Sequence, residues 1–447
     1  MRVVVIGGDA VGMTAASQIK RSLGDDVDVI VIQEQQWTSY SACGIPYWIA
    51  GETTGPDTLV ARSPEQHREH GIDVRTGMLA SAIDPDTGSV TMQPVTGGPA
   101  TRLGYDHLVI GTGSRPRTPP VDGLDLPGVY RVQTLDEGQA AIDGLARDPR
   151  TAVVLGAGYI GIEMAEAGVQ RGLATTVVDL APEPMVSLDA DMGCLVRAGM
   201  TERGVDMRMG EPVRELLAGA DGRVRAVVTD AGEIPADIVF LGLGVTPRTE
   251  LAAAAGLPLG EHGGLLTDDH QRVRGYGNIW AGGDCVEVTD RLTGAERYLP
   301  LGTHANKHGR VIGVNIAGGD LAFPGVIGTA ITKFCDLEVS RTGLKEDEQD
   351  GLVSVLIHAQ TSVGYMPDSA VMAVKMIAER TTGRLMGTQI VGGRGAAMRI
   401  DTAATAIWTG MTAPELVQLD LAYSPPFSPV WDPVQVAARV LLGKLSD

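Results

Sequence analysis

The 447-residue chain has few cysteines, and none lie close together in the sequence. The four are far apart and form neither a Cys-x-x-Cys pair nor a metal-ligand spacing: Cys43, Cys194, Cys285 and Cys335. This pattern excludes a disulfide framework and a cysteine-based metal centre. It predicts a reduced, cytoplasmic protein with no metal site.

Long apolar runs and positive charge are also lacking. No apolar run reaches the roughly 18 residues of a membrane span. The short run at 3–6 enters a glycine turn without a cleavage site, which predicts a buried strand rather than a signal peptide. A net charge of −19 argues against nucleic acid as a partner, because phosphate contacts need clustered Lys and Arg. The negative charge does not exclude small anionic ligands, because helix N-termini can bind them.

Aromatic residues make up only 4% of the chain, whereas glycine is abundant, with 59 residues. This balance is typical of an α/β protein with many tight turns rather than of a fibrous or disordered one. The length exceeds what one hydrophobic core fills, so two to four domains are expected.

The first unit of the chain is strand, glycine turn, helix, strand. An apolar strand at 3–6 precedes a turn with Gly7, Gly8 and Gly12, and a helix is expected at 13–23. Asp9 stands where the dinucleotide fingerprint has its middle glycine, so a purely structural turn is about as well supported as a nucleotide site.

A ribose-binding acid is expected after the second strand of such a unit. The strand at 27–32 is followed by Gln33 and then Glu34. Either side chain could accept from ribose hydroxyls, and the sequence leaves the choice open.

The second unit matches the fingerprint in full. A strand at 151–155 leads into Gly156, Gly158 and Gly161; a helix at 162–171 and a strand at 175–178 follow, and that strand ends at Asp179. Asp179 would accept from both ribose hydroxyls and repel a 2′-phosphate, and no arginine follows it. NADH is therefore expected in preference to NADPH.

Three further strands run into turns of small residues. They precede Thr112 and Gly113, Gly244, and Asp284. An aspartate after a strand and two glycines can accept from polyol hydroxyls beside a pyrophosphate, although a simple turn aspartate is the alternative. Two dinucleotide sites in one chain indicate that one dinucleotide passes electrons to the other.

Cys43 lies among small and turn-forming residues at 39–47, with no second cysteine nearby. If a helix follows, its N-terminus would lower the pKa of the thiol and favour the thiolate, the form that attacks disulfides and peroxides. The alternative is a small, buried, inert side chain.

Together these motifs resemble the flavin-dependent pyridine nucleotide–disulfide oxidoreductases, and most of all the single-cysteine branch with the coenzyme A disulfide reductases and NADH oxidases. The segments that carry the resemblance are 39–47, 156–163, 281–284, 305–307 and 419–427. It implies an α/β fold with two Rossmann-like domains, for FAD and NADH, and an α+β C-terminal dimerisation domain. The implied boundaries are 1–115 and 245–325 for the FAD domain, 116–244 for the NAD(P)H domain and 326–447 for dimerisation.

The resemblance assigns roles to particular residues. FAD would be held by Gly7, Gly8, Gly12, Gln33 or Glu34, Thr112, Gly113 and Asp284. NADH would be held by Gly156, Gly158, Tyr159, Gly161, Glu163, Asp179 and Gly244, with Tyr159 gating the nicotinamide and Glu163 near it. Arg21, Ser39 and Tyr40 would contact coenzyme A, although a solvated helix face explains Arg21 equally well.

The resemblance also implies that Tyr365 and Tyr423 reach into the partner's cleft, which requires a homodimer; interface residues are the alternative. Electrons would pass from NADH through FAD to Cys43 and on to a small thiol disulfide or persulfide, coenzyme A disulfide above all. A second hypothesis is an NADH oxidase in which Cys43 cycles through a sulfenate. Peroxide is the disfavoured acceptor, because Ala10 stands where the peroxidases carry a histidine. A third hypothesis for the function is a non-catalytic redox-sensing flavoprotein.

Overall fold

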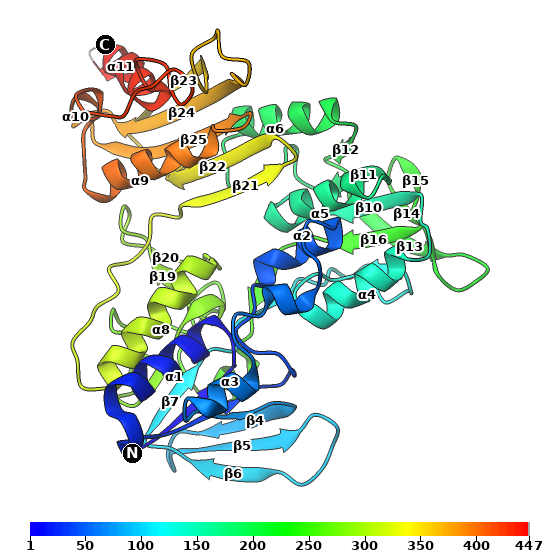
Figure 1. Cartoon of the computed structure of the whole chain (residues 1–447), viewed down its shortest axis with the longest axis vertical. Coiled ribbons are helices and arrows are strands. Elements are labelled where there is room, and N and C mark those ends of the chain that lie inside the picture. Colours follow the sequence, from blue (N-terminus) through cyan, green and yellow to red (C-terminus); the bar gives the residue numbers. More distant parts are fainter. Residues whose placement is uncertain (446–447) are drawn as a thin grey trace.

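The computed structural model describes residues 1–445, which form three lobes (Figure 1). The N-terminus lies in the lower lobe and residue 445 in the upper one, with the third lobe to the side. No helix within residues 1–445 is long and apolar enough to cross a membrane.

The N-terminal lobe is built on a five-stranded parallel sheet. Its strand order is β18 (Ile279–Ala281), β7 (His107–Ile110), β1 (Arg2–Ile6), β2 (Asp28–Ile32) and β3 (Asp73–Arg75). Because β18 comes from far along the chain, this sheet is completed only when the chain returns. The flanking pieces are α1 (Ala10–Leu23), α8 (Gly302–Ile316), α3 (Pro64–Glu69), α7 (Glu250–Ala254), and an antiparallel sheet of β4 (Met78–Asp84), β5 (Ser89–Pro94) and β6 (Thr101–Gly104).

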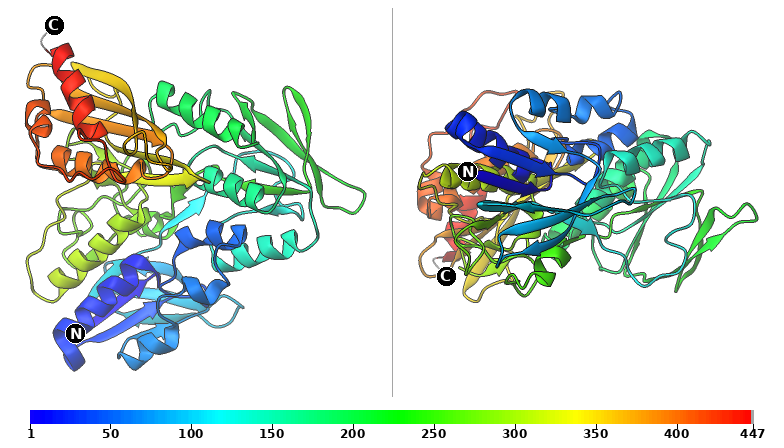
Figure 2. Two further views of the ribbon diagram at one scale, coloured as in Figure 1. Left: turned by 45° about the horizontal axis from the view of Figure 1, so that its top comes forward. Right: turned by 90° about the horizontal axis from the view of Figure 1, so that it is seen from below.

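Helices α1 and α8 pack closely on one face of this sheet, as Figure 2 shows from two further sides. The close approach needs glycine on α8. A Cβ at Gly309 would lie 2.6 Å from the carbonyl oxygen of Val11, and one at Gly313 would lie 2.6 Å from Cβ of Gln18. Buried β1, β2 and α1 side chains form the core between the layers.

The second lobe repeats the design. Its parallel sheet has the order β12 (Asp206–Met209), β11 (Ala174–Asp179), β10 (Thr151–Leu155), β16 (Ile238–Leu241) and β9 (Val129–Tyr130). The flanking pieces are α4 (Leu135–Leu145), α5 (Tyr159–Gln170), α6 (Ala190–Glu202), and an antiparallel sheet of β13 (Val213–Ala218), β14 (Val224–Thr229) and β15 (Gly232–Pro235). The chain enters and leaves this lobe through the antiparallel pair β8 (Ser114–Pro116) and β17 (Val245–Pro247).

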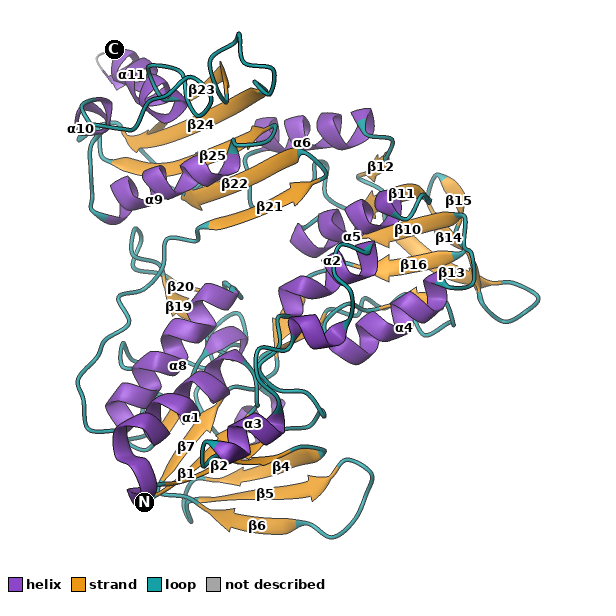
Figure 3. Ribbon diagram, in the orientation of Figure 1, coloured by secondary structure: helices purple, strands orange, loops and turns teal. Residues whose placement is uncertain are grey.

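The C-terminal lobe is an antiparallel sheet covered by helices (Figure 3). The strand order is β21 (Ala330–Phe334), β22 (Leu337–Gly343), β25 (Leu385–Gly392), β24 (Val371–Glu379) and β23 (Leu352–Gln360). Its helices are α9 (Ile400–Trp408), α10 (Ala413–Val417) and α11 (Pro433–Leu445). The short hairpin β19 (Val288–Thr289) and β20 (Glu296–Arg297) precedes it, and α2 (Ile45–Ala50) lies between the first two lobes.

The predicted fold class, two Rossmann-like units and an α+β C-terminal unit, is confirmed. Both turn-following helices begin three residues earlier than expected, α1 at Ala10 and α5 at Tyr159. The reason is that the last residues of each glycine turn already form the first helical turn.

Candidate active site

The first glycine turn lies at the carboxyl end of β1 and is fixed by backbone contacts. Gly7 has φ 103°, and a Cβ there would lie 2.1 Å from the carbonyl oxygen of Gly111. A Cβ at Gly12 would lie 1.9 Å from the carbonyl oxygen of Gly7. Both positions therefore require glycine, and the turn delivers the N-terminus of α1 to the end of the sheet, where a pyrophosphate fits.

The second turn has the same geometry. Gly156 has φ 102°, and a Cβ there would lie 2.3 Å from the carbonyl oxygen of Gly242. A Cβ at Gly161 would lie 1.9 Å from the carbonyl oxygen of Gly156. Around Gly158, by contrast, a Cβ would meet no described atom within 4 Å, so this position opens onto the space that a pyrophosphate would occupy.

Asp9, which replaces the middle glycine of the first turn, is tied to the loop that carries Cys43. Its carboxylate accepts from the backbone N–H groups of Tyr40 and Ala10, and the N–H of Ser39 donates to the carbonyl oxygen of Gly8 at 3.1 Å. Burial raises the pKa of Asp9 to about 6, and the nearby carboxylate of Asp284 adds to the rise.

The candidate ribose-binding side chains contact their own turns. Gln33 is buried; its Oε1 accepts from the N–H of Gly8 at 2.8 Å and its Nε2 donates to the carbonyl oxygen of Trp37. Glu34 forms an ion pair of 2.7 Å with Arg248. In the second unit, Oδ2 of Asp179 accepts from the N–H of Ala157 at 2.6 Å.

The polar residues at the ends of β7 and β18 lie together. Oδ2 of Asp284 accepts from the hydroxyl of Ser114 at 3.0 Å, and burial raises the pKa of this carboxyl. Thr112 donates through its hydroxyl to the carbonyl oxygen of Arg248 at 2.6 Å, and Gly113 has φ 69°. With the first turn they form a cradle of small residues and acceptors at one sheet edge, which fits the FAD expected there.

Cys43 lies in a 3-10 turn (Ala42–Gly44) that runs directly into α2. Its side chain is exposed, so the alternative of a buried, inert cysteine is wrong. The expected helix is present, but the expected lowering of the thiol pKa is wrong. Partial removal of water raises this pKa, and the carboxylates of Glu163 and Asp284 raise it further. A backbone hydrogen bond to the Cys43 sulfur lowers the pKa by less than these effects raise it.

Glu163 and Tyr159 lie in the first turns of α5. Burial raises the pKa of Glu163 to about 7, although its Oε1 accepts from the hydroxyl of Thr332 at 3.0 Å. The Tyr159 hydroxyl lies 3.4 Å from that of Ser187. Gly244, the last residue assigned to the NADH site, has φ 81° and follows β16.

The residues assigned to coenzyme A divide into two places. Arg21 is exposed near the end of α1, where it donates to Oε1 of Gln18 at 3.0 Å. Ser39 and Tyr40 lie just before Cys43. Ser39 adopts φ 48°, and its hydroxyl lies 3.0 Å from Nε2 of the buried His67.

Tyr365 and Tyr423 lie on adjacent loops of the C-terminal lobe. The N–H of Val363 donates to the carbonyl oxygen of Pro425 at 3.1 Å and joins the two loops. The tyrosines are 72% and 49% exposed in the single chain. Exposed rings of this kind fit residues that a partner subunit covers.

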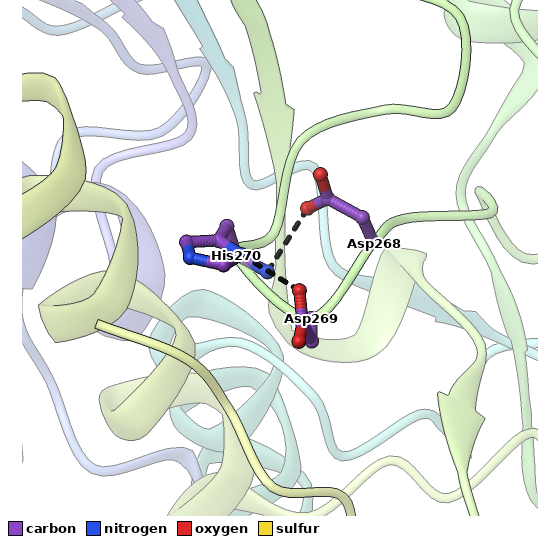
Figure 4. A group of neighbouring side chains, drawn as sticks. All are labelled: Asp268, Asp269 and His270. Atoms are coloured by element: carbon purple, nitrogen blue, oxygen red, sulfur yellow. Dashed lines mark hydrogen bonds and ion pairs between the residues drawn. The ribbon is translucent and has the colours of Figure 1, made fainter. Parts of the chain in front are cut away.

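Two clusters escaped the sequence analysis because no motif spacing marks them. Lys333 on β21 contacts Glu166 on α5 and Glu52 after α2. His270 joins Asp269 and Asp320 through its two ring nitrogens, each at 2.7 Å. Figure 4 shows that Asp268 also lies beside His270, and the backbone N–H of His270 donates to Oδ1 of Asp268. Since both ring nitrogens of His270 already contact carboxylates, this group has a structural role, joining the segments that carry Asp269 and Asp320.

Comparison with known proteins identifies the class. Residues 1–309 match the model of the pyridine nucleotide-disulphide oxidoreductases, and residues 329–433 match the dimerisation domain of the same family. The chain belongs to the pyridine nucleotide-disulphide oxidoreductase family, and it is an NAD(P)H-dependent oxidoreductase.

Individual relatives cover nearly the whole chain. An NAD(P)H coenzyme A polysulfide/persulfide reductase of Pyrococcus horikoshii is 38% identical, over 98% of both chains. An NADH oxidase of Methanocaldococcus jannaschii is 36% identical over 100% of both. The structure of an NAD-dependent persulfide reductase from A. fulgidus has a TM-score of 0.95 and 37% identity, covering all of this chain and 84% of that one.

Proposed function

We propose that this enzyme uses NADH to reduce a small thiol disulfide or persulfide at Cys43, with coenzyme A as the thiol. The observation that carries the proposal is the position of Cys43, exposed in the 3-10 turn just before α2, with α2 packed against the helix of the NADH turn. Arg171, after α5, donates from Nε to the carbonyl oxygen of Ile49 in α2 at 2.7 Å. The coenzyme A persulfide activity named for the Pyrococcus relative supports the substrate class.

The two cofactor sites divide the work. The turn from Gly156 to Gly161 and the carboxylate of Asp179 would orient NADH, and the first turn with Asp284 would hold FAD. Bound FAD would supply the two-electron relay between NADH and sulfur. Tyr159 would cover the nicotinamide position until NADH displaces its ring, while Glu163 lines the same end of α5.

Cys43 would perform the sulfur chemistry as a thiolate. Its attack on one sulfur of a disulfide forms a new S–S bond, breaks the old one and releases one thiolate. Two electrons then cleave the mixed disulfide, releasing the second thiolate and restoring Cys43. For a persulfide, the same attack would release sulfide. Because the pKa of Cys43 is raised, the attack should accelerate with rising pH.

The assembled enzyme would be a homodimer. The match to the dimerisation domain and the exposed rings of Tyr365 and Tyr423 support a site completed by two subunits. A phenol at that place would donate a proton to the departing thiolate. Arg21 would bind a phosphate of coenzyme A, with Ser39 and Tyr40 along the arm that leads to Cys43.

A second candidate function is an NADH oxidase that reduces oxygen. It is favoured by the relative of that name in Methanocaldococcus jannaschii. In this case Cys43 would cycle through a sulfenate. The first glycine turn offers Ala10 rather than an imidazole to protonate a peroxide, which keeps peroxide the weaker acceptor.

The deciding experiment measures NADH consumption by the FAD-loaded protein without oxygen, with and without coenzyme A disulfide, and then in air. We expect anaerobic turnover that requires the disulfide and that Cys43→Ser abolishes. Cys194→Ser, which removes another exposed cysteine, is the matched control and should retain activity. Turnover that appears only in air would instead assign the oxidase.

A further inference from the structure

Lys333 lies where the three lobes meet. It extends from β21 of the C-terminal lobe, and its Nζ lies 2.6 Å from Oε1 of Glu166 on α5 and 3.3 Å from Oε1 of Glu52, two residues after α2. Its ammonium also lies over the ring of Tyr47, 5.3 Å from the centroid. One cation therefore contacts the helix of the NADH turn and the helix that follows Cys43.

The joint between α2 and α5 is hydrogen-bonded around this cation. Nε2 of Gln170 donates to both Glu52 and Glu166 at 2.9 Å. Glu166 is 2% exposed, and among the described residues its Oε2 has no hydrogen-bond partner. A countercharge stabilises a buried carboxylate in its charged form, and Lys333 lies within ion-pair distance of Glu166.

The residue before Lys333 contacts the nicotinamide end of the same helix. The hydroxyl of Thr332 donates to Oε1 of Glu163 at 3.0 Å, one helical turn before Glu166. Adjacent residues of β21 thus hold two carboxylates of α5. The groups that face Glu163 are Glu166 and Tyr159 from α5, Thr332 and Lys333 from β21, and Cys43 and Tyr47 from the 3-10 turn and α2.

We propose that Lys333 is a positioning residue that holds the NADH-binding helix α5 and helix α2, which follows Cys43, in one alignment for electron transfer. The inference rests on the proposed use of NADH and Cys43, although not on the identity of the sulfur acceptor. Lys333 touches no reacting atom and acts through Glu166, Glu52 and Tyr47.

The test is Lys333→Met in the FAD-loaded dimer, with reduction of the bound flavin by NADH followed in a single anaerobic turnover. We expect a limiting rate about tenfold lower at an unchanged NADH dissociation constant, because misalignment costs rate rather than binding. Lys333→Arg should restore most of the rate. Lys444→Met, which removes an exposed lysine of the same lobe that donates to the carbonyl oxygen of Ser354, should change nothing.

A second variant separates the alignment of α2 and α5 from the neutralisation of the Glu166 charge. It also tests the proposal if Lys333→Met does not fold. Glu166→Gln/Lys333→Met leaves no unpaired buried carboxylate but still lacks the link to Glu52. A rate that stays low supports the positioning role. A wild-type rate in this double variant, or in Lys333→Met itself, overturns it.

A pH profile supplies a readout that simple loss of stability would not move. Lys333 lowers the pKa of Glu163 from what burial alone would produce. Lys333→Met should therefore shift the Glu163 midpoint upward, and the midpoint can be read from the alkylation rate of Cys43 against pH. An unshifted midpoint argues that Lys333 does not hold this end of α5. Because flavin reduction needs no disulfide, failure of coenzyme A disulfide as a substrate would remove the proposed function while leaving this result intact.

Discussion

The two dinucleotide-binding units have the same turn in different chemical surroundings. The first glycine of each has nearly the same φ, 103° at Gly7 and 102° at Gly156, and a Cβ on the third would meet the carbonyl oxygen of the first at 1.9 Å in both. The outer glycines are therefore imposed by the backbone. The middle position is not, since Asp9 and Gly158 are both extended, with φ −116° and −83°.

The difference at the middle position gives the two turns different contacts. Asp9 binds the backbone of Tyr40 and so ties the first turn to the loop of Cys43. No side chain can do this at Gly158, which leaves the second turn open to its ligand. A departure from the motif in the first unit thus links the first glycine turn to the loop of Cys43.

The largest effect should come from the glycines that the backbone requires. Gly12→Val and Gly161→Val each place carbon atoms against a carbonyl oxygen, so each should disrupt its own turn. We expect Gly12→Val to lose flavin, seen as loss of the visible absorbance. Gly161→Val should stay yellow but reduce its flavin with NADH at least ~100-fold more slowly. Equal flavin loss in both would break the assignment of the turns to different nucleotides.

The next largest effect is expected at Asp179 and Gln33, the hydrogen-bond acceptors that follow the second strand of each unit. Asp179→Ser removes the carboxylate that disfavours a 2′-phosphate, so kcat/KM for NADPH relative to NADH should rise about tenfold. Gln33→Ala should leave this ratio unchanged and weaken flavin retention instead, because its amide holds the N–H of Gly8. A changed nucleotide preference in Gln33→Ala would contradict the assignment.

A smaller effect is expected at Glu163, which raises the pKa of the Cys43 thiol. Glu163→Gln removes a negative charge, lowers that pKa and should speed alkylation of Cys43 at pH 8 about threefold. Peptide-resolved labelling with iodoacetamide measures it without turnover. Glu233→Gln, on an exposed strand of the same lobe, is the control. Slower alkylation in Glu163→Gln would show that Glu163 does not oppose the thiolate.

The last prediction concerns the stability of the fold rather than a rate, at Asp9, whose pKa rises from 3.8 to about 6 on folding. A carboxyl with a raised pKa stabilises the fold while protonated, and this contribution is lost as pH rises through about 6. Asp9→Asn should therefore raise the free energy of unfolding at pH 8 by up to about 3 kcal/mol and change it little below pH 4. Chemical denaturation of the flavin-free protein at the two pH values measures this, with the exposed Glu261→Gln as control.

Much of the architecture could be predicted because it is local. The strand–turn–helix order and the required glycines of each unit are encoded in short segments, and the sheets and the family match agree with them. The assignment of individual residues to FAD, NADH and coenzyme A, and the domain boundaries, stay predictions. The direction of the pKa shift of Cys43 was predicted wrongly, because its desolvation and the approach of Glu163 and Asp284, which are far from it in sequence, arise only in the fold.

The sequence by itself determined two glycine turns of the nucleotide-binding kind, one candidate redox cysteine and the resemblance to the family. Local sequence is enough for these features because backbone conformation and motif spacing depend on neighbouring residues. The tertiary structure alone decided which carboxylates face Cys43, that Gln33 is committed to the first turn, and that Lys333 joins three lobes. Burial and the electrostatics of buried groups are properties of packing, so no pattern within one segment encodes them.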